Sequence, residues 1–475
     1  MKTFLLFCYF AGWMLLPHLL LLKKRPSATL AWLWAILFIP WIGALAYLTF
    51  GTDQMKRRRL KRRKLFSARV SARQGPASST DDATTALLQG LSRRDSQFLG
   101  LLSRINQLPA SSAEGLRILR NADEFYPALA ARIQAARHHI HLEFYIWQDD
   151  ETGAKFLQLL TDAARRGVIV RLLLDGVGSH RFAESLLTDY LAAGGEFSWF
   201  QSLDPRRYRF SLNLRNHRKL QIIDGTIAFV GGMNLGREYE GRDVALGHWR
   251  DVQVEAIGSV ACGLQEIFAD DWFFATGKKI SEAAYYPAVT ARARHPVHIV
   301  LGGPDRRNEP ISKSIVSLLN EATDRVWIAT GYFVPDDILL AALELAASRG
   351  VDVRLLVSEK NDHPWLVVVG RSYYDQLLAA GVRIFEYSVG INHSKIALAD
   401  TKWAMVGSAN LDYRSMRLNF ELNLLFHSAE QTAILARILE KDFDLCQEIE
   451  PAAFARRSFR EKFTEAALRP LSPLL

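Results

Sequence analysis

From about residue 116, apolar residues along the chain alternate between two spacings. Four of them mark one face of a helix: Phe156, Leu159, Leu160 and Ala163. This spacing stops before Gly167, and an unbroken apolar run follows at 168–174. The first pattern predicts an amphipathic helix that ends at the glycine, and the run predicts a buried strand.

The same succession returns in the second half of the chain. Residues 339–347 have helical spacing, Gly350 follows, and 351–357 form another apolar run. The segments 191–194 and 378–381, both Leu-Ala-Ala-Gly, mark a second helix end in each half. Strands that alternate with helices predict a layered α/β domain, and the repetition predicts that this domain is duplicated.

Two uncharged runs near the N-terminus, 4–22 and 28–50, are each long enough to cross a bilayer core of about 30 Å as a helix. We expect a two-helix transmembrane hairpin. A cleaved signal peptide is the alternative, which the second run and the lack of an Ala-x-Ala site disfavour. Eight positive charges at 56–64, against three at 23–25, predict that the remainder of the chain is cytoplasmic.

Composition narrows the class of partner. The 475 residues have a net charge of +9 and are 49% hydrophobic, which favours sizeable cores and an anionic partner. Because the basic stretch 56–64 directly follows a predicted span, it favours anionic lipid headgroups over nucleic acid. The three cysteines, Cys8, Cys262 and Cys446, lack Cys-x-x-Cys spacing and predict neither a disulfide framework nor a zinc site.

These patterns divide the chain into four parts. Residues 1–64 are the predicted membrane anchor, and 65–115, rich in Ser, Ala, Arg and Thr, are the predicted linker. The two α/β domains are predicted at 116–292 and 293–475.

One motif with chemically active side chains occurs in each half. The first copy contains His217, Lys219, Asp224 and, after Gly-Gly-Met, Asn234. The second copy lies a constant 176 positions further on and contains His393, Lys395, Asp400, Ser408 and Asn410. Two copies of His-x-Lys-x4-Asp, each followed by Gly-[Gly/Ser]-x-Asn at one distance, predict a common function.

The motif predicts a strand at 217–223, a turn at 224–225 and a return strand at 226–230. On a strand, His217 and Lys219 share a face, and so do their counterparts in the second half. Apposed halves would therefore gather two imidazoles and two ammonium groups, which suits a phosphodiester. One neutral imidazole can attack phosphorus while the other, protonated, donates to the leaving alkoxide.

The other polar residues of the motif complete this site. We expect the phosphoryl oxygens to be bound by Lys219, Lys395, Asn234, Ser408 and Asn410. A metal is not expected, because each lysine puts a positive charge beside its histidine. Asp224 and Asp400 lie at the turns, on the opposite parity to the histidines, and are expected to be structural.

The double motif resembles the phospholipase D superfamily, and four further sequences narrow the resemblance to bacterial-type cardiolipin synthases. They are Arg215-Asn216-His217-Arg218-Lys219, Trp249-Arg250-Asp251, Tyr332-Phe333-Val334-Pro335-Asp336 and Leu471-Ser472-Pro473-Leu474-Leu475. The resemblance implies two tandem phospholipase D-like α/β/α sandwich domains about a pseudo-twofold, with both motifs at a shared cleft. It also implies an enzyme of the bacterial inner membrane that joins two phosphatidylglycerol molecules into cardiolipin, releases glycerol and uses no cofactor.

Roles for individual residues follow from the same resemblance. His217 would be the nucleophile that forms a phosphohistidine, and His393 the acid and then the base. In this superfamily a later acidic residue orients each histidine, and the matching positions are Glu421 for His393 and Asp251 for His217.

Three alternatives share these motifs: a hydrolytic phospholipase D, a membrane-tethered nuclease and a non-catalytic scaffold. An insertion of about eleven residues before His217 is interpreted either as a solvated loop or as a site that draws an anionic headgroup into the cleft. Its arginines are Arg206, Arg207, Arg209 and Arg215. Departures from the family pattern at Gly331 and at Ile391-Asn392 concern the acceptor pocket, and the acceptor and the oligomeric state are not predicted.

Overall fold

The computed structural model describes residues 13–21, 26–48, 82–201, 215–243, 246–287, 292–306, 308–361 and 363–474. The basic stretch 56–64 and the insertion's Arg206, Arg207 and Arg209 lie outside these residues. The chain forms two compact units: residues 1–62 with 204–212, and the remainder.

Three helices make up the described part of the N-terminal unit: α2 (Leu15–Leu21), α3 (Pro26–Phe38) and α4 (Pro40–Ala46). Leu19, Ile36 and Tyr47 are buried among them. The predicted second span is divided at Pro40, because proline lacks an amide hydrogen and disfavours a helical backbone at Ile39, where φ is −130° and ψ is 64°. Within the described ranges, no helix combines the length and apolar character needed to cross a membrane.

Seven strands form the first sheet of the larger unit, in the order β2-β9-β7-β6-β3-β4-β5. They are β2 (Gly115–Arg120), β3 (His139–Phe144), β4 (Ile169–Leu174), β5 (Glu196–Trp199), β6 (Leu220–Ile223), β7 (Ile227–Gly231) and β9 (Val252–Ile257). β3, β4 and β5 are parallel, and the other neighbours are antiparallel. The predicted helix and strand around Gly167 are confirmed as α9 (Glu151–Arg165) and β4.

The second sheet repeats this order and adds a strand at each edge: β1-β10-β19-β17-β16-β11-β13-β14-β20. Its strands are β1 (Ser111–Ala113), β10 (His295–Gly302), β11 (Arg325–Ala329), β13 (Asp352–Ser358), β14 (Arg383–Tyr387), β16 (Ile396–Ala399), β17 (Trp403–Gly407), β19 (Glu421–His427) and β20 (Cys446–Glu448). The hairpin β6–β7 corresponds to β16–β17, and β9 corresponds to β19. The predicted duplication is therefore confirmed at the level of topology.

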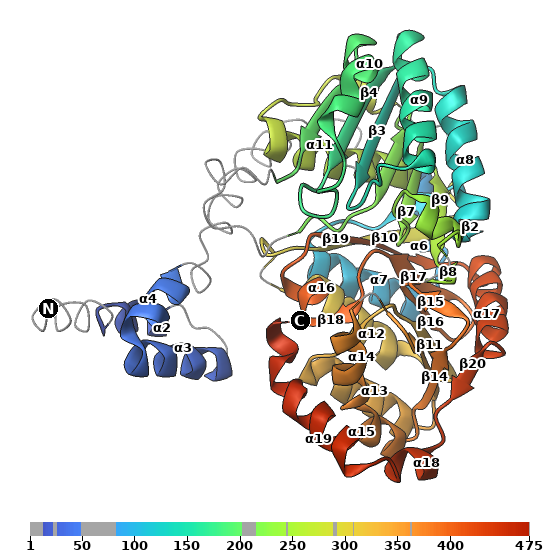
Figure 1. Cartoon of the computed structure of the whole chain (residues 1–475). Helices are drawn as coiled ribbons and strands as arrows, with labels where there is room; N and C mark the ends of the chain where they lie inside the picture. Colours follow the sequence, from blue (N-terminus) through green and yellow to red (C-terminus); the bar gives the residue numbers. More distant parts are fainter. Residues whose placement is uncertain are drawn as a thin grey trace, which may run out of the picture. The chain divides into compact units, whose positions relative to one another are not determined.

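Helices cover both faces of each sheet, as Figure 1 shows. α8 (Asn121–Ala135) and α9 pack on one face of the first sheet and α11 (Ser259–Thr276) on the other. Their counterparts are α12 (Pro310–Glu321), α13 (Asp337–Ser348) and α17 (Ala429–Phe443). The shorter helices are α10 (Thr188–Ala192), α14 (Pro364–Arg371), α15 (Tyr374–Ala379), α16 (Tyr413–Arg417), α18 (Pro451–Ala455) and α19 (Phe459–Leu468). Each half is thus an α/β/α sandwich.

Part of the predicted linker belongs to the second half, which corrects the assignment of 65–115. This segment contains α6 (Asp82–Gln89), α7 (Arg93–Asn106) and β1. Phe98, Leu99 and Leu102 of α7 are buried in the core of the second half, and the Phe98 ring lies edge-on to Trp403 at 4.7 Å. The polar composition concealed this role, because a single apolar stripe is enough to dock a helix.

Two parallel strand pairings join the halves. β8 (His248–Arg250) pairs with β15 (Gly390–Asn392), and Asn216 forms an isolated bridge with Phe420. The two junctions have the same pattern with the halves exchanged, as a pseudo-twofold relation requires. In each half, the residue at the junction, Asn216 or Asn392, comes directly before a motif histidine.

Candidate active site

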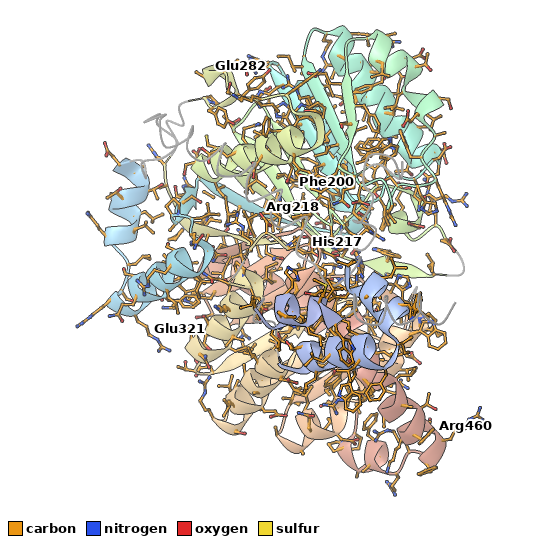
Figure 2. All side chains as sticks on the ribbon, turned by 90° about the vertical axis from the view of Figure 1, so that its left-hand side faces the viewer. Phe200, His217, Arg218, Glu282, Glu321 and Arg460 are labelled. Carbon is orange, nitrogen blue, oxygen red and sulfur yellow. The ribbon has the colours of Figure 1, made fainter. Side chains whose placement is uncertain are left out.

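Each motif histidine directly follows one of the junctions between the halves. The His217 amide donates to the Phe420 carbonyl at 2.9 Å, and the His393 amide donates to the Arg250 carbonyl at 2.7 Å. Because these residues pair with the opposite half, β6 begins three residues later than the strand predicted from 217. Figure 2 shows His217 where the two halves meet.

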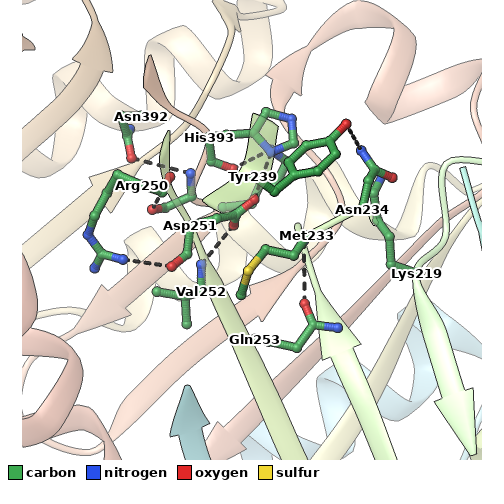
Figure 3. Close-up of polar contacts among 12 residues, drawn as sticks. Lys219, Met233, Asn234, Tyr239, Arg250, Asp251, Val252, Gln253, Asn392 and His393 are labelled. Carbon is green, nitrogen blue, oxygen red and sulfur yellow. Dashed lines mark hydrogen bonds and ion pairs between the residues drawn. The ribbon is translucent and has the colours of Figure 1, made fainter. Parts of the chain in front are cut away.

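A carboxylate from the opposite half binds each histidine. The Nδ1 atom of His217 lies 3.0 Å from both carboxylate oxygens of Glu421. The Nδ1 atom of His393 lies 2.7 Å from Oδ2 of Asp251, a contact drawn in Figure 3. All four side chains are buried.

The assignment of the acids from the resemblance, Glu421 to His393 and Asp251 to His217, is therefore wrong. The physical reason is the pairing at the junctions. Phe420 lies beside Asn216, so the next residue along each strand brings Glu421 to His217.

Further contacts fix the carboxylates. The Ser408 hydroxyl donates to Oε2 of Glu421 at 2.5 Å and accepts from the Leu422 amide at 2.9 Å. Ser408 therefore positions Glu421, instead of binding phosphate through its hydroxyl as predicted. Its counterpart in the first half is Gly232, where a Cβ atom would lie only 2.4 Å from Oδ1 of Asp251.

The two lysines lie beside the histidines as predicted from strand parity. The Nζ atom of Lys219 donates to the His217 carbonyl at 2.8 Å, and Lys395 makes the same contact with the His393 carbonyl. Burial lowers the pKa of Lys219 to about 7; Glu421 opposes this shift and the charge of Lys395 adds to it. The Lys219 amine is therefore only partly protonated near neutral pH, and a bound anion would favour its charged form.

Both imidazoles are neutral in the substrate-free site at neutral pH. Burial lowers the pKa of His217 despite the nearby Glu421 carboxylate, and burial together with Lys395 lowers the pKa of His393 to about 4. Burial alone would raise the pKa of Glu421, but His217 and Lys219 outweigh it and the net shift is downward. Each Nδ1–H therefore points at a carboxylate, and each Nε2 has a lone pair for chemistry.

The two asparagines of the motif differ in their contacts. Asn234 accepts from the Ile146 amide at 3.1 Å and donates to the Tyr239 hydroxyl at 3.1 Å, so its amide holds the surrounding loops (Figure 3). The Oδ1 atom of Asn410 is buried with no hydrogen-bond partner among the described residues. Of the pair, Asn410 is the better placed to respond to a ligand.

Asp224 and Asp400 have structural contacts. Both occupy turn positions with positive φ, 52° and 53°. The Asp224 carboxylate accepts from the main-chain amides of residues 137–139, and that of Asp400 accepts from those of 323–325. They hold the starts of β3 and β11, which agrees with the role expected from their parity.

Three aromatic rings lie beside the histidines. Trp249 and Tyr332 belong to the sequences that carry the family resemblance but were given no role, and Tyr145 was not singled out. The Tyr145 ring lies edge-on to His217 at 4.9 Å, and the Nζ atom of Lys219 lies 5.2 Å from its centroid. The rings of Trp249 and Tyr332 lie 5.2 and 6.4 Å from that of His393.

Sheet register in the structure relates one of these rings to a residue of the second half. In β3 His141 pairs with Ile222, and in β11 Trp327 pairs with Leu398, so Tyr145 corresponds to Gly331. The unusual glycine is thus the counterpart of an aromatic ring in the first half.

The last arginine of the insertion belongs to this site. Burial and Asp175 raise the pKa of the Tyr145 hydroxyl to about 12, and Arg215 and Arg414 act in the opposite direction. Arg215 also fixes the junction, because its carbonyl accepts from the Phe420 amide at 2.8 Å.

The buried site thus contains two imidazoles, two ammonium groups and two carboxylates. The positive charge of Lys395 also lowers the pKa of His217, and that of Lys219 lowers the pKa of His393, so the two motifs share one electrostatic environment. Such a set of side chains can supply a nucleophile and an acid–base group for one phosphodiester, with the lysines stabilising the charge that develops on its oxygens. Among the residues that the structure describes, no cluster of three or more His, Cys, Asp or Glu side chains is arranged to hold a metal ion.

Comparison with known proteins agrees with this geometry. The family model described as "Cardiolipin synthase, PLD-like domain" matches residues 129–244 and 315–443, and the model "Phospholipase_D-nuclease N-terminal" matches 10–51. The chain is 36% identical over 456 residues to a cardiolipin synthase of Geobacillus kaustophilus, covering 95% of this chain and 90% of the relative. It is 36% identical over 455 residues to cardiolipin synthase 2 of Bacillus anthracis, covering 95% and 88%.

A solved structure shares the fold. The phosphatidylserine synthase of Haemophilus influenzae superimposes with a TM-score of 0.59 at 16% identity, covering 80% of this chain and 100% of that one. Three findings point to one family: the repeated sandwich domains, the two family-model matches and the similarity along nearly the whole chain. The chain belongs to the cardiolipin synthase family of phospholipase D-like proteins.

Proposed function

We propose that this protein is a cardiolipin synthase that transfers a phosphatidyl group from one phosphatidylglycerol to another. The observation that supports this most directly is the pair of buried histidines, each bound through Nδ1 to a carboxylate of the opposite half. Such a pair supplies a nucleophile and an acid–base group for one phosphodiester.

In the first step, Nε2 of His217 attacks the phosphorus of the donor lipid. The bond from phosphorus to the glycerol headgroup breaks, and protonated His393 gives its proton to the departing oxygen. The negative phosphodiester raises the pKa of His393 above its substrate-free value, so that the acid is charged when the substrate is bound. Glu421 stabilises the positive charge that develops on His217.

In the second step, His393 acts as the base. It takes the proton of the terminal hydroxyl of a second phosphatidylglycerol, whose oxygen attacks the phosphohistidine. The nitrogen–phosphorus bond breaks, His217 is restored and cardiolipin leaves. Lys219 and Lys395 stabilise the phosphoryl charge in both steps.

The test supplies detergent-solubilised protein with headgroup-labelled phosphatidylglycerol as the sole lipid. We expect cardiolipin and an equal amount of free glycerol, and neither in the matched His217→Ala variant. Phosphatidic acid in place of cardiolipin would identify water as the acceptor and make the protein a hydrolase that uses the same intermediate. Cleavage of DNA without any lipid product would favour the nuclease alternative.

We further propose that 4–22 and 28–50 anchor the protein in the bacterial inner membrane, with both catalytic halves in the cytoplasm. Large apolar side chains of the N-terminal helices support this, because Met14, Leu21 and Ile42 are 81%, 80% and 68% exposed. Such surfaces are stable in lipid and not in water. The expected partners are phosphatidylglycerol and the membrane, without a nucleic acid.

Labelling of single cysteines in intact cells tests this topology. In a variant whose native cysteines are replaced by serine, Lys24→Cys should react with an impermeant maleimide from outside. Lys61→Cys should react only after the cells are permeabilised. Equal labelling of both positions from outside would refute the proposed orientation.

A further inference from the structure

Helix α19 presents aromatic side chains to solvent. Phe459 and Phe463 are 82% and 63% exposed, and their rings stack with centroids 6.1 Å apart. Glu465, on the opposite side of the helix, is buried. Surface helices of globular proteins have the reverse arrangement, with the apolar stripe turned to the core. This stripe therefore needs a partner outside the catalytic unit.

Contacts at the start of the helix fix its direction. Ser458 and Glu461 form a capping box. Arg457 binds Asp375 of α15 at 2.7 Å and Glu465 at 2.8 Å, both as ion pairs. Because α19 is held at its first turn and along its buried side, the two phenylalanines face outward as a consequence of the fold.

Basic side chains flank the aromatic stripe. At about 100° per residue, Arg460 and Lys462 lie on either side of the line from Phe459 to Phe463. Residues 456–463 contain four basic side chains and one acidic side chain. Figure 2 shows Arg460 at the outer edge of the second half, directed away from the molecule. An aromatic stripe between basic flanks is typical of a helix that lies at the headgroup level of an anionic bilayer.

Packing contacts connect α19 with the active site. α19 packs against α14, which carries Trp365, another ring that is 65% exposed. Residues of α14, among them Leu366 and Gly370, line a hollow together with Tyr332. The Tyr332 ring in turn lies 6.4 Å from that of His393.

We propose that Phe459, Phe463 and Trp365, with Arg460 and Lys462, form a surface by which the catalytic unit docks on an anionic phospholipid bilayer. Docking brings the hollow lined by Tyr332, whose ring neighbours His393, to the membrane, where a lipid substrate resides. The inference rests on the proposed function, since it assumes that the substrate is supplied from a bilayer.

Surface kinetics of the full-length protein test the proposal. Activity is measured on vesicles of phosphatidylglycerol diluted in phosphatidylcholine, and on a short-chain phosphatidylglycerol below its micelle concentration. We expect Phe459→Ser/Phe463→Ser to lower the vesicle rate at least tenfold and to change the rate on the monomeric substrate less than twofold. Arg460→Gln/Lys462→Gln should remove most of the preference for vesicles rich in anionic lipid.

The matched control is Leu186→Ser/Leu191→Ser, which removes exposed apolar side chains from the first half and should leave both rates unchanged. Equal losses on both substrates would indicate damage to the fold, and unchanged vesicle rates would overturn the docking surface. A smaller oligomer in the phenylalanine variant would show that a second copy covers the stripe. Absence of activity in the unaltered protein would instead count against the proposed function.

Discussion

Tyr145 and Gly331 mark one difference between the two corresponding histidine environments. The Tyr145 ring covers one side of His217, whereas a Cβ atom at residue 331 would lie 3.4 Å from the Cα atom of His393. The glycine thus lets the main chain approach His393 closely, next to the hollow that includes Tyr332. The two histidines are equally buried, so this difference lies in the groups that surround them and not in their exposure.

The crossed acid pairs predict that the two carboxamide variants fail at different steps. With a donor lipid whose leaving group is p-nitrophenol, the first step needs no acid. Asp251→Asn, which impairs His393, should still release about one equivalent of nitrophenol in a burst and then turn over slowly. Glu421→Gln, which impairs His217, should show no burst and a first step slower by about 10³-fold. A burst in the Glu421 variant and none in the Asp251 variant would restore the uncrossed pairing.

The lowered pKa of Lys219 predicts an alkaline limit to activity. Because a lysine loses its charge as the pH rises through its pKa, kcat/KM should fall more steeply above about pH 7, the pKa of Lys219 in the free enzyme. This fall adds to the decline that the deprotonation of His393, with a pKa of about 4, already causes. The arginine in a Lys219→Arg variant stays charged at all these pH values. The fall in kcat/KM that begins near pH 7 should therefore move upward by about two pH units or more, whatever the variant's maximum rate. Lys278→Arg, on the surface, is the control, and an unmoved limb in the Lys219 variant would contradict the assignment.

At the scale of elements, the sequence predicted what repeats and missed what occurs once. Helical and strand periodicity was sufficient for α9 and β4, and the motif repeated at a constant offset of 176 residues was sufficient for both motif hairpins. Helix α7 has no counterpart in the first half and comes from a segment rich in polar residues, so neither repetition nor composition indicated it. The sequence could not predict which carboxylate binds which histidine, because this depends on how the segment before each histidine pairs with the opposite half.

Docking of α7 in the second core predicts a large effect from one side chain. Phe98→Ala removes a ring that is buried against Trp403 and should lower the free energy of unfolding by about 3–5 kcal/mol. Leu101→Ala, on the exposed side of the same helix, should change it by less than about 0.5 kcal/mol. Chemical unfolding followed by near-ultraviolet circular dichroism compares them. Similar stability of the two variants would mean that α7 is only loosely attached.

At the scale of the whole molecule, the duplication is functional only when the halves are joined. Each half supplies a histidine and a lysine but takes its carboxylate from the other. The strand pairing of β8 with β15 sets one of these contacts, since Asp251 and His393 each come one residue after the pairing ends. Arg250 strengthens this junction through its ion pair with Asp442 at 2.9 Å.

Gly390 in this junction predicts how activity depends on the spacing of the halves. A Cβ atom there would lie 2.1 Å from the His248 carbonyl oxygen, so Gly390→Ala must push β15 away from β8. His393 would move relative to Asp251, and a displacement near 1 Å should lower kcat by about 10²-fold while both sandwich domains stay folded. Gly100→Ala, where the nearest atom is 3.7 Å away, is the matched control and should retain full activity. Because Glu421 binds His217 at the other junction, the nitrophenol burst should survive in the Gly390 variant. Its loss would mean that the two junctions move together as one rigid contact.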